Sequence, residues 1–231
     1  MAPVTLITGG STGIGAATAR RLLDAGHRVA VTGRDEDRLA AFADSVASGT
    51  DQLMTLPGDT GEHADVLAAV ESTVRAWGRL DNAIANAGFT AAGTVADQDP
   101  EAMRAMVLTN VLGPSLVVRE CLPHLRETNG RIVLVGSVAG EKNTPGNLYS
   151  VTKWAVRALA ENTRMLVTGD GVGVTLVAPG LVDTPFWEGR GLPDRPAMTA
   201  DQIADCVVFA LNQPAGLDIN SIVVRPIGQP N

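Results

Sequence analysis

The stretch PVTLITGGSTGIG at residues 3–15 decides the fold. An apolar run typical of a buried strand leads into a glycine-rich turn, and the turn opens a segment with helical periodicity. Glycines permit a tight turn, let backbone N–H groups approach a pyrophosphate, and allow close packing of helix on strand. The spacing is G-x-x-x-G-x-G, and such a cluster alone could be only a turn. Its place between a strand and a helix favours a phosphate-binding loop, with contacts from Gly9, Ser11, Thr12, Gly13, Ile14 and Gly15.

The rest of the chain repeats this order of strand and helix. Short runs rich in Val, Ile and Leu lie at 3–8, 27–32, 51–56, 80–85, 130–135, 173–178 and 219–224. Segments of helical period lie near 14–25, 36–48, 61–77, 100–126, 147–168 and 200–212. Asp99 before Pro100, and Thr199 with Gln202, are signals for helix starts. The order predicts an α/β fold, a Rossmann-type doubly wound seven-stranded parallel sheet with helices on both faces, as a single domain over residues 1–231.

Composition and charge exclude several classes of protein. Hydrophobic residues make up 45% and charged residues 19%, as in ordinary globular domains. A net charge of −7 offers no basic surface for nucleic acid, and no apolar run reaches the roughly 18 residues of a membrane span. Cys121 and Cys206 stand far apart without neighbouring His or Cys, so neither a disulfide nor a metal site is expected. Because the N-terminus also lacks the features of a signal peptide, the sequence predicts a cytoplasmic protein.

The end of the second predicted strand indicates which dinucleotide would bind. A carboxylate there would bind the adenosine ribose hydroxyls, whereas an arginine suits a 2′-phosphate. Gly33 stands where the acid is expected, Arg34 follows, and Asp35 is suited to capping the next helix. The sequence therefore predicts NADP(H) in preference to NAD(H).

The sequence LYSVTKWA at residues 148–155 holds the only tyrosine of the chain, Tyr149, four residues before Lys153. The chain has only two lysines, and a lysine ammonium beside a phenol can change its proton affinity. The alternative is a buried tyrosine near a surface lysine, since residues four apart share a helix face.

Six motifs stand in one order along the chain. They are TGxxxGIG at residues 8–15, NAG at 86–88, an asparagine at Asn110, a serine at Ser137, YxxxK at 149–153 and PG at 179–180. In this order the sequence resembles the short-chain dehydrogenase/reductase family over essentially its whole length. The resemblance implies an NADP(H)-dependent carbonyl reductase or alcohol dehydrogenase that transfers a hydride between the nicotinamide and a small carbonyl or secondary alcohol.

The same resemblance implies a role for each matching residue. Tyr149 would be the general acid/base, and Lys153 together with the positive charge of the oxidised nicotinamide would lower its pKa. Lys153 would also bind the nicotinamide ribose, and Ser137 would donate to the substrate oxygen. Asn110 would hold a water that links Lys153 to solvent. The implied cofactor contacts beyond the glycine loop and Arg34 are Asp59, Thr60, Asn86, Ala87, Gly88, Tyr149, Lys153, Pro179, Gly180, Val182 and Thr184.

Several of these residues have structural alternatives. Ser137 could simply end a strand, Asn110 could be a buried polar kink near Gly113 and Pro114, and Thr60 could cap the next helix. Ser137 and Tyr149 are twelve residues apart, one fewer than the commonest family spacing, which leaves the shape of the loop between them open.

The segment 181–199 is the longest irregular stretch and is expected to be a substrate loop within the domain. Phe186 and Trp187 would form an aromatic lid or an apolar anchor, and Arg190 and Arg195 would meet a substrate carboxylate or remain solvated. The set expected to shape the substrate site is Val138, Asn143, Gly180, Phe186, Trp187 and Met198.

Three alternatives to a reductase of small carbonyls remain. They are a catalytically inactive NADP-binding sensor or scaffold, an acyl-carrier ketoreductase, and an epimerase or dehydratase with bound cofactor. The C-terminus lacks the Gly-Gly pair that often follows the last strand in acyl-carrier ketoreductases. Apolar coverage on the helices predicted at 100–126 and 147–168 exceeds what one sheet contact requires, so a homo-oligomer (tetramer or dimer) through these helices is expected.

Overall fold

The computed structural model describes residues 1–46 and 51–230. Its centre is a seven-stranded parallel sheet with strand order β3-β2-β1-β4-β5-β6-β9. The strands are β1 (Val4–Thr8), β2 (Arg28–Gly33), β3 (Leu53–Pro57), β4 (Asn82–Ala85), β5 (Arg131–Val135), β6 (Gly173–Pro179) and β9 (Ser221–Val224). The seven predicted strands and the fold class are therefore confirmed.

The order of the strands creates a crevice at the carboxyl ends of the central strands. β1 pairs with β2 on one side and with β4 on the other, and every residue of β1 is buried. The chain thus builds outward from β1 to β3 and then returns to the far side of β1. In parallel sheets a ligand binds at such a reversal, outside the carboxyl ends of the strands.

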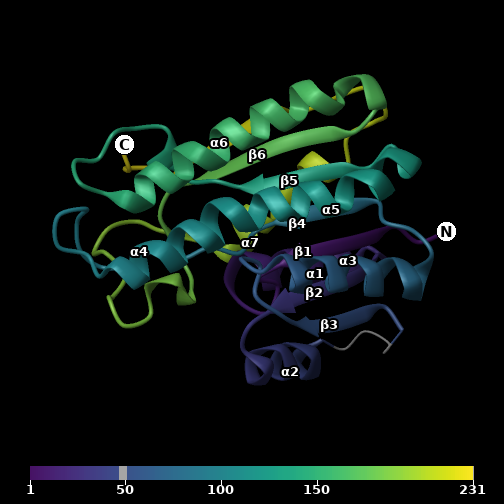
Figure 1. The fold of residues 1–231 in the computed structure, drawn as a ribbon, viewed down its shortest axis with the longest axis horizontal. Helices are drawn as coiled ribbons and strands as arrows, with labels where there is room; N and C mark the ends of the chain where they lie inside the picture. The colour runs from purple at the N-terminus through teal and green to yellow at the C-terminus, as the bar shows by residue number, and fades with distance from the viewer. Residues whose placement is uncertain (47–50, 231) are drawn as a thin grey trace.

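Helices cover both faces of the sheet (Figure 1). On one face lie α3 (His63–Trp77), α5 (Gly113–Thr128) and α6 (Leu148–Val167), and on the other lie α1 (Gly13–Asp24), α2 (Glu36–Ser45) and α7 (Ala200–Leu211). Each face has its own apolar cluster, with Leu80, Leu125 and Ile132 in one and Leu22, Ile84 and Ile203 in the other. The layers hold the strand ends rigidly in place beneath the crevice.

Three predicted helix caps are confirmed. Asp35 and Asp99 accept hydrogen bonds from the third residue beyond them, and Thr199 forms a capping box with Gln202. The alternative that Thr60 caps the following helix is wrong, because Glu62 occupies the cap position. The helix predicted over 36–48 ends at Ser45, and its predicted residues 47 and 48 lie outside the described residues.

The helix predicted over 100–126 consists of three parts. α4 (Pro100–Val107) and α5 are joined by a π-helical turn, Leu108–Leu112. Pro114 has no N–H to offer the carbonyl of Asn110, and the N–H of Gly113 donates to Leu108, five residues earlier. The predicted kink near Gly113 and Pro114 is thus confirmed, with Asn110 inside it.

The same composite helix, Pro100–Thr128, is long and apolar enough to cross a membrane by length and composition. Within its most apolar window, 56% of the residues are buried inside the fold, as in the core helix of a globular protein. Figure 1 shows α4 extending from α5 past the sheet, next to the loops that close the crevice.

The segment 181–199 is more ordered than its sequence predicts. β7 (Val182–Asp183) pairs in parallel with β8 (Met198–Thr199), and a 3-10 turn spans Pro185–Trp187. The small sheet ties both ends of the loop together. Strands of two residues carry no periodic pattern, so the sequence gives no signal for them.

Candidate active site

A cleft of about 980 Å³ lies at the carboxyl ends of the strands. This volume lies at the upper end of the range found for sites that bind cofactors and small molecules. Most of the predicted site residues line it: Gly9, Ser11, Thr12, Gly13, Ile14, Arg34, Asp59, Thr60, Asn86, Ala87, Gly88, Ser137, Tyr149, Lys153, Pro179, Gly180, Val182 and Thr184. Two predicted site residues do not line the cleft. Gly15 and Asn110 lie behind its wall and support it.

The glycine turn leaves room for a phosphate group because its backbone packs without side chains. Gly9 has φ of +63°, a left-handed conformation that glycine adopts without steric cost. A Cβ on Gly15 would lie 2.2 Å from the carbonyl oxygen of Gly9, so only glycine allows this approach of helix to strand. The amide of Asn86 donates to the carbonyls of Thr8 and Gly9, at 3.0 and 2.9 Å, and clamps β4 to the turn. The N-terminus of α1 opens on the cleft, so the residues present fit a pyrophosphate.

The far end of the cleft, beside β2, carries two arginines. Arg34 lies 3.7 Å from Asp59, and its guanidinium carbon lies 5.9 Å from the ring centre of Phe89. Arg38 pairs with Asp35 at 3.2 Å and with Glu188, in the 181–199 loop, at 2.8 Å. The sequence identified Arg34, whereas Arg38, Phe89 and Glu188 were missed. Arg38 lies in the first turn of α2, which begins directly after the strand end that carries Arg34, and the predicted start of this helix was an available signal.

The opposite end of the cleft is built on α6. Asn147 caps this helix by accepting from the N–H of Ser150, and Tyr149 and Lys153 follow one turn apart. Lys153 is 5% exposed, and its ammonium donates to the carbonyl of Val135 at 2.9 Å. The ammonium lies 5.7 Å from the ring centre of Tyr149. A lysine has three donors, so two remain directed toward the cleft.

Burial controls the proton affinity of this pair. It raises the pKa of Tyr149 to about 12, although a hydrogen bond with Ser137 and the charge of Arg190 act in the opposite direction. It lowers the pKa of Lys153 to about 8. The net shift of the Tyr149 pKa in the chain without ligands is therefore upward, because desolvation of the phenolate is the largest effect. The expected lowering by Lys153 together with the charge of an oxidised nicotinamide concerns the cofactor-bound state and stays a prediction.

Ser137 and Asn110 are held by local hydrogen bonds. The hydroxyl oxygen of Ser137 accepts from the N–H of Ala139 at 3.1 Å, and the same hydroxyl hydrogen-bonds with Tyr149. The side chain of Asn110 accepts from the N–H of Phe89 and donates to its carbonyl, at 3.0 and 2.8 Å. It also donates to the hydroxyl of Thr152 at 3.1 Å, and Thr152 in turn donates to the carbonyl of Tyr149. Asn110 thus braces the segment that carries Tyr149.

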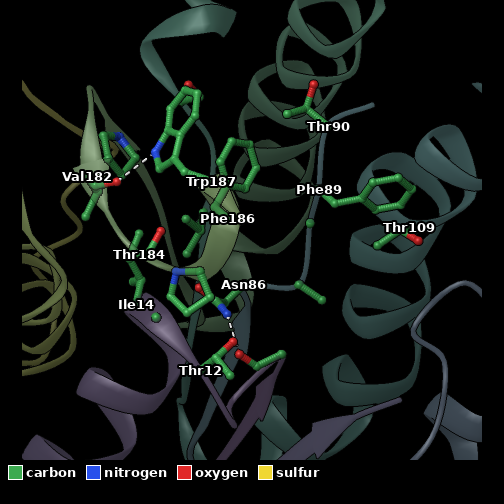
Figure 2. Close-up of a pocket in the computed structure, with 18 of the residues that line it drawn as sticks. Thr12, Ile14, Asn86, Phe89, Thr90, Thr109, Val182, Thr184, Phe186 and Trp187 are labelled. Atoms are coloured by element: carbon green, nitrogen blue, oxygen red, sulfur yellow. Dashed lines mark hydrogen bonds between the residues drawn. The ribbon is translucent and has the colours of Figure 1, made fainter. Parts of the chain in front are cut away.

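The 181–199 loop covers the cleft opposite the glycine turn. Figure 2 shows Phe186 and Trp187 on one side and Thr12 and Ile14 on the other. The ring of Phe186 lies 5.7 Å from that of Tyr149, and Trp187 donates to the carbonyl of Val182 at 3.0 Å.

The other residues expected to shape the substrate site divide into two groups. Val138, Gly180, Arg190 and Arg195 line the cleft with Phe186 and Trp187, but Asn143 and Met198 do not, because Asn143 is exposed and Met198 is buried in the small sheet. Gln229 also lines the cleft and accepts from the N–H of Leu181. Sequence reasoning missed it, since a short C-terminal tail carries no motif.

No group of three or more His, Cys, Asp or Glu side chains that could hold a metal ion occurs in residues 1–46 and 51–230. Thr60 contributes a different feature. Its hydroxyl is buried at the cleft wall and has no hydrogen-bond partner within the described residues, so it remains available to a ligand.

Comparison with known proteins agrees with this geometry. The family model described as short chain dehydrogenase matches residues 3–192. An uncharacterised oxidoreductase of Staphylococcus saprophyticus is 32% identical over 227 residues, which cover 97% of each chain, and one of Staphylococcus haemolyticus is 32% identical over 226 residues, 97% of each chain. The crystal structure of an alcohol dehydrogenase from the archaeon Thermococcus sibiricus, complexed with 5-hydroxy-NADP, superimposes with a TM-score of 0.89 at 27% identity and covers 99% of this chain and 98% of that one. The matched family, the fold and the cleft lead to one conclusion: the chain is an oxidoreductase that belongs to the short-chain dehydrogenase/reductase family.

Proposed function

We propose that the protein is an NADP(H)-dependent carbonyl reductase or alcohol dehydrogenase for a small substrate. The observation that carries this proposal is the arrangement of one cleft. Ser137, Tyr149 and Lys153 gather at one end, the glycine turn forms the middle, and Arg34 lies at the other end.

Each residue of the catalytic end has a distinct part in the proposed reaction. The nicotinamide, when bound, supplies the hydride for reduction or accepts it for oxidation. Ser137 donates its O–H to the substrate oxygen, in place of its hydrogen bond with Tyr149, and holds that oxygen beside Tyr149. Tyr149 gives its proton to the carbonyl oxygen in reduction, for which its raised pKa keeps the phenol protonated. Lys153, charged below a pH of about 8, holds positive charge behind the phenol and replaces the proton.

The preference for NADP(H) over NAD(H) is part of the proposal. Two guanidinium groups, Arg34 and Arg38, line the end of the cleft where the adenosine ribose would lie, and guanidinium is well suited to a phosphate. The Thermococcus sibiricus alcohol dehydrogenase, similar over its whole length, was crystallised with 5-hydroxy-NADP.

The deciding experiment compares Tyr149→Phe with wild type. Loss of a general acid should lower kcat by about a hundredfold to ten-thousandfold. NADPH binding, measured by calorimetry, should be nearly unchanged because the phenol oxygen is not a phosphate contact. An unchanged rate in Tyr149→Phe would rule out the acid role. A wild type that binds NADPH but reduces no carbonyl in a broad panel would favour the inactive sensor or scaffold.

We also propose that the protein acts in the cytoplasm as a homo-oligomer through α4, α5 and α6. Large apolar side chains are exposed on α4, on the π-helical turn that joins it to α5, and on α6: Val107, Leu112, Val151, Trp154, Met165 and Leu166. Exposed apolar groups clustered on neighbouring helices favour association. Light scattering should give a dimer or tetramer, and Leu166→Glu should weaken it, whereas a monomer at all concentrations would exclude this proposal.

A further inference from the structure

The cations around the cleft form two groups that differ in their partners. At the adenosine end, the three carboxylates that line the cleft, Asp35, Asp59 and Glu188, each lie against Arg34 or Arg38. Lys142, Arg190 and Arg195 also line the cleft, and Arg190 lies near the catalytic end, because it stacks on Phe186, whose ring centre lies 5.7 Å from that of Tyr149. None of these three forms an ion pair with any carboxylate in the described part of the chain. The cleft therefore holds positive charge without a carboxylate partner, and part of it lies beside the catalytic groups.

Arg190 is the cation most closely connected with the catalytic group. Its guanidinium carbon lies 5.1 Å from the ring centre of Phe186 and 5.3 Å from that of Trp187. One N–H donates to the carbonyl of Phe186 at 2.6 Å, and the ring of Phe186 contacts that of Tyr149 at 5.7 Å. Arg190 and Tyr149 line the same cleft, and the charge of Arg190 opposes the rise that burial causes in the pKa of Tyr149. Stacking on two rings holds the guanidinium in place and leaves further N–H groups to bind a ligand.

The location of the two lysines also indicates that positive charge is concentrated in this cleft. The chain carries a net charge of −7 and has only two lysines, Lys142 and Lys153, yet both line this cleft. An acidic protein repels anions over most of its surface, and a local group of cations reverses that effect where they converge.

We propose that the substrate is a short oxo acid, or the corresponding hydroxy acid, whose carboxylate binds Arg190 while its carbonyl or hydroxyl oxygen lies at Ser137 and Tyr149. Arg195 and Lys142 add longer-range attraction. A guanidinium offers a planar pair of donors that matches a carboxylate. The inference rests on the proposed reductase function, and it adds the charge and chemical class of the substrate.

The first experiment measures NADPH-dependent reduction of a 3-oxo acid and of its methyl ester, which differ at the far end in charge and by one methyl group. Wild type should show a kcat/KM at least about tenfold higher for the acid, the effect of one charged hydrogen bond. Arg190→Gln should abolish this ratio, Arg190→Lys should restore part of it, and Arg195→Gln or Lys142→Gln should reduce it less. The ratio in wild type should also fall with added salt, because the three side chains are exposed. Arg75→Gln, on the exposed face of α3, is the matched control and should leave the ratio unchanged.

The second experiment needs no turnover. Butanoate and its neutral analogue butanamide are titrated against the full chain with NADP⁺ or NAD⁺ present, and tryptophan fluorescence is recorded. Trp187 stacks on Arg190, so a bound carboxylate should change its emission, and Trp187→Phe identifies that signal. Butanoate should bind at least about tenfold more tightly than butanamide, and Arg190→Gln should remove the difference.

The two experiments separate the failure of this inference from the failure of the proposed function. If the ester is reduced as well as the acid, and Arg190→Gln leaves their ratio unchanged, the carboxylate site is refuted while the reductase stands. If butanoate and butanamide bind equally, the site is also refuted. If no oxo acid is reduced but butanoate binds in an Arg190-dependent manner, the site stands and the reductase assignment fails.

Discussion

Replacing Lys153 by methionine should change how the stability of the fold depends on pH. Burial lowers the pKa of this 5% exposed ammonium from 10.5 to about 8. In the unfolded chain the amine regains its ordinary pKa, so between the two values the unfolded state holds a proton that the folded state has released. The free energy of unfolding of wild type therefore rises with pH across this window. Below this pH window, Lys153 is charged in both states, and the folded state is destabilised by the full free energy of burying that charge.

The size of the effect follows from the two pKa values. At about 1.4 kcal/mol per pH unit, burial of the charge costs the folded state about 3 kcal/mol at neutral pH. Between about pH 7 and about pH 9.5, wild type should gain about 2 kcal/mol relative to Lys153→Met. The hydrogen bond from Lys153 to Val135 is absent from the variant at every pH. Its loss displaces the whole stability curve without changing the slope.

Urea denaturation of the cofactor-free chain, at fixed protein concentration and several pH values, measures this difference. Lys142→Met is the matched control, because Lys142 is exposed and has no buried charge to relieve. If Lys153→Met does not fold, carbon-13 labelling of lysine gives a direct test, since the chain has only two lysines and Lys142→Arg assigns them. The Lys153 signal should titrate near pH 8. The reasoning would be refuted if the difference in free energy of unfolding between wild type and Lys153→Met did not change with pH. It would also be refuted if the Lys153 signal titrated near the ordinary lysine pKa of 10.5.

Three further predictions test the cofactor end of the cleft. Arg34→Asp should reduce the preference for NADPH over NADH by about tenfold to a hundredfold, measured as the ratio of kcat/KM values, and an unchanged ratio would exclude Arg34 as the 2′-phosphate ligand. Asn86→Ala removes two hydrogen bonds to the glycine turn and should lower the free energy of unfolding by about 2 kcal/mol in urea, whereas an unchanged value would show that the clamp is dispensable. Gly15→Ala places a methyl group 2.2 Å from the carbonyl of Gly9 and should abolish thermal stabilisation by NADPH, whereas Gly169→Ala, with nothing within 4 Å, should not.

The strands and most helices could be predicted because the central strands of the sheet are buried on both faces and are therefore rich in apolar residues. Residues such as Asp99 and Thr199 mark where helices begin. The π-turn at Leu108–Leu112 was visible only as a kink, because Pro114 shows that a helical hydrogen bond is lost but not how the chain compensates. The pairing of β7 with β8 depends on residues sixteen apart in two-residue strands, for which no periodic signal exists.

The candidate site was predictable where a short motif and a strand end coincide. Ser137, Tyr149 and Lys153 lie together in the cleft as the motif spacing indicated. The contact between Arg38 and Glu188 joins residues 150 positions apart, and only the folded chain brings them together. The upward shift of the Tyr149 pKa in the chain without ligands could not be predicted, because the number of groups that shield a phenol from water cannot be read from the five residues of its motif.

The position of both lysines in the cleft has a consequence for handling the protein. Reagents directed at primary amines can react only with the N-terminus and with Lys142 and Lys153. Apart from reaction at the N-terminus, a fluorescent succinimidyl ester, an aldehyde support or an amine cross-linker would therefore attach within the cleft that holds the catalytic groups. Immobilisation or labelling that preserves turnover would have to use another chemistry, such as a tag or the thiol of the partly exposed Cys206.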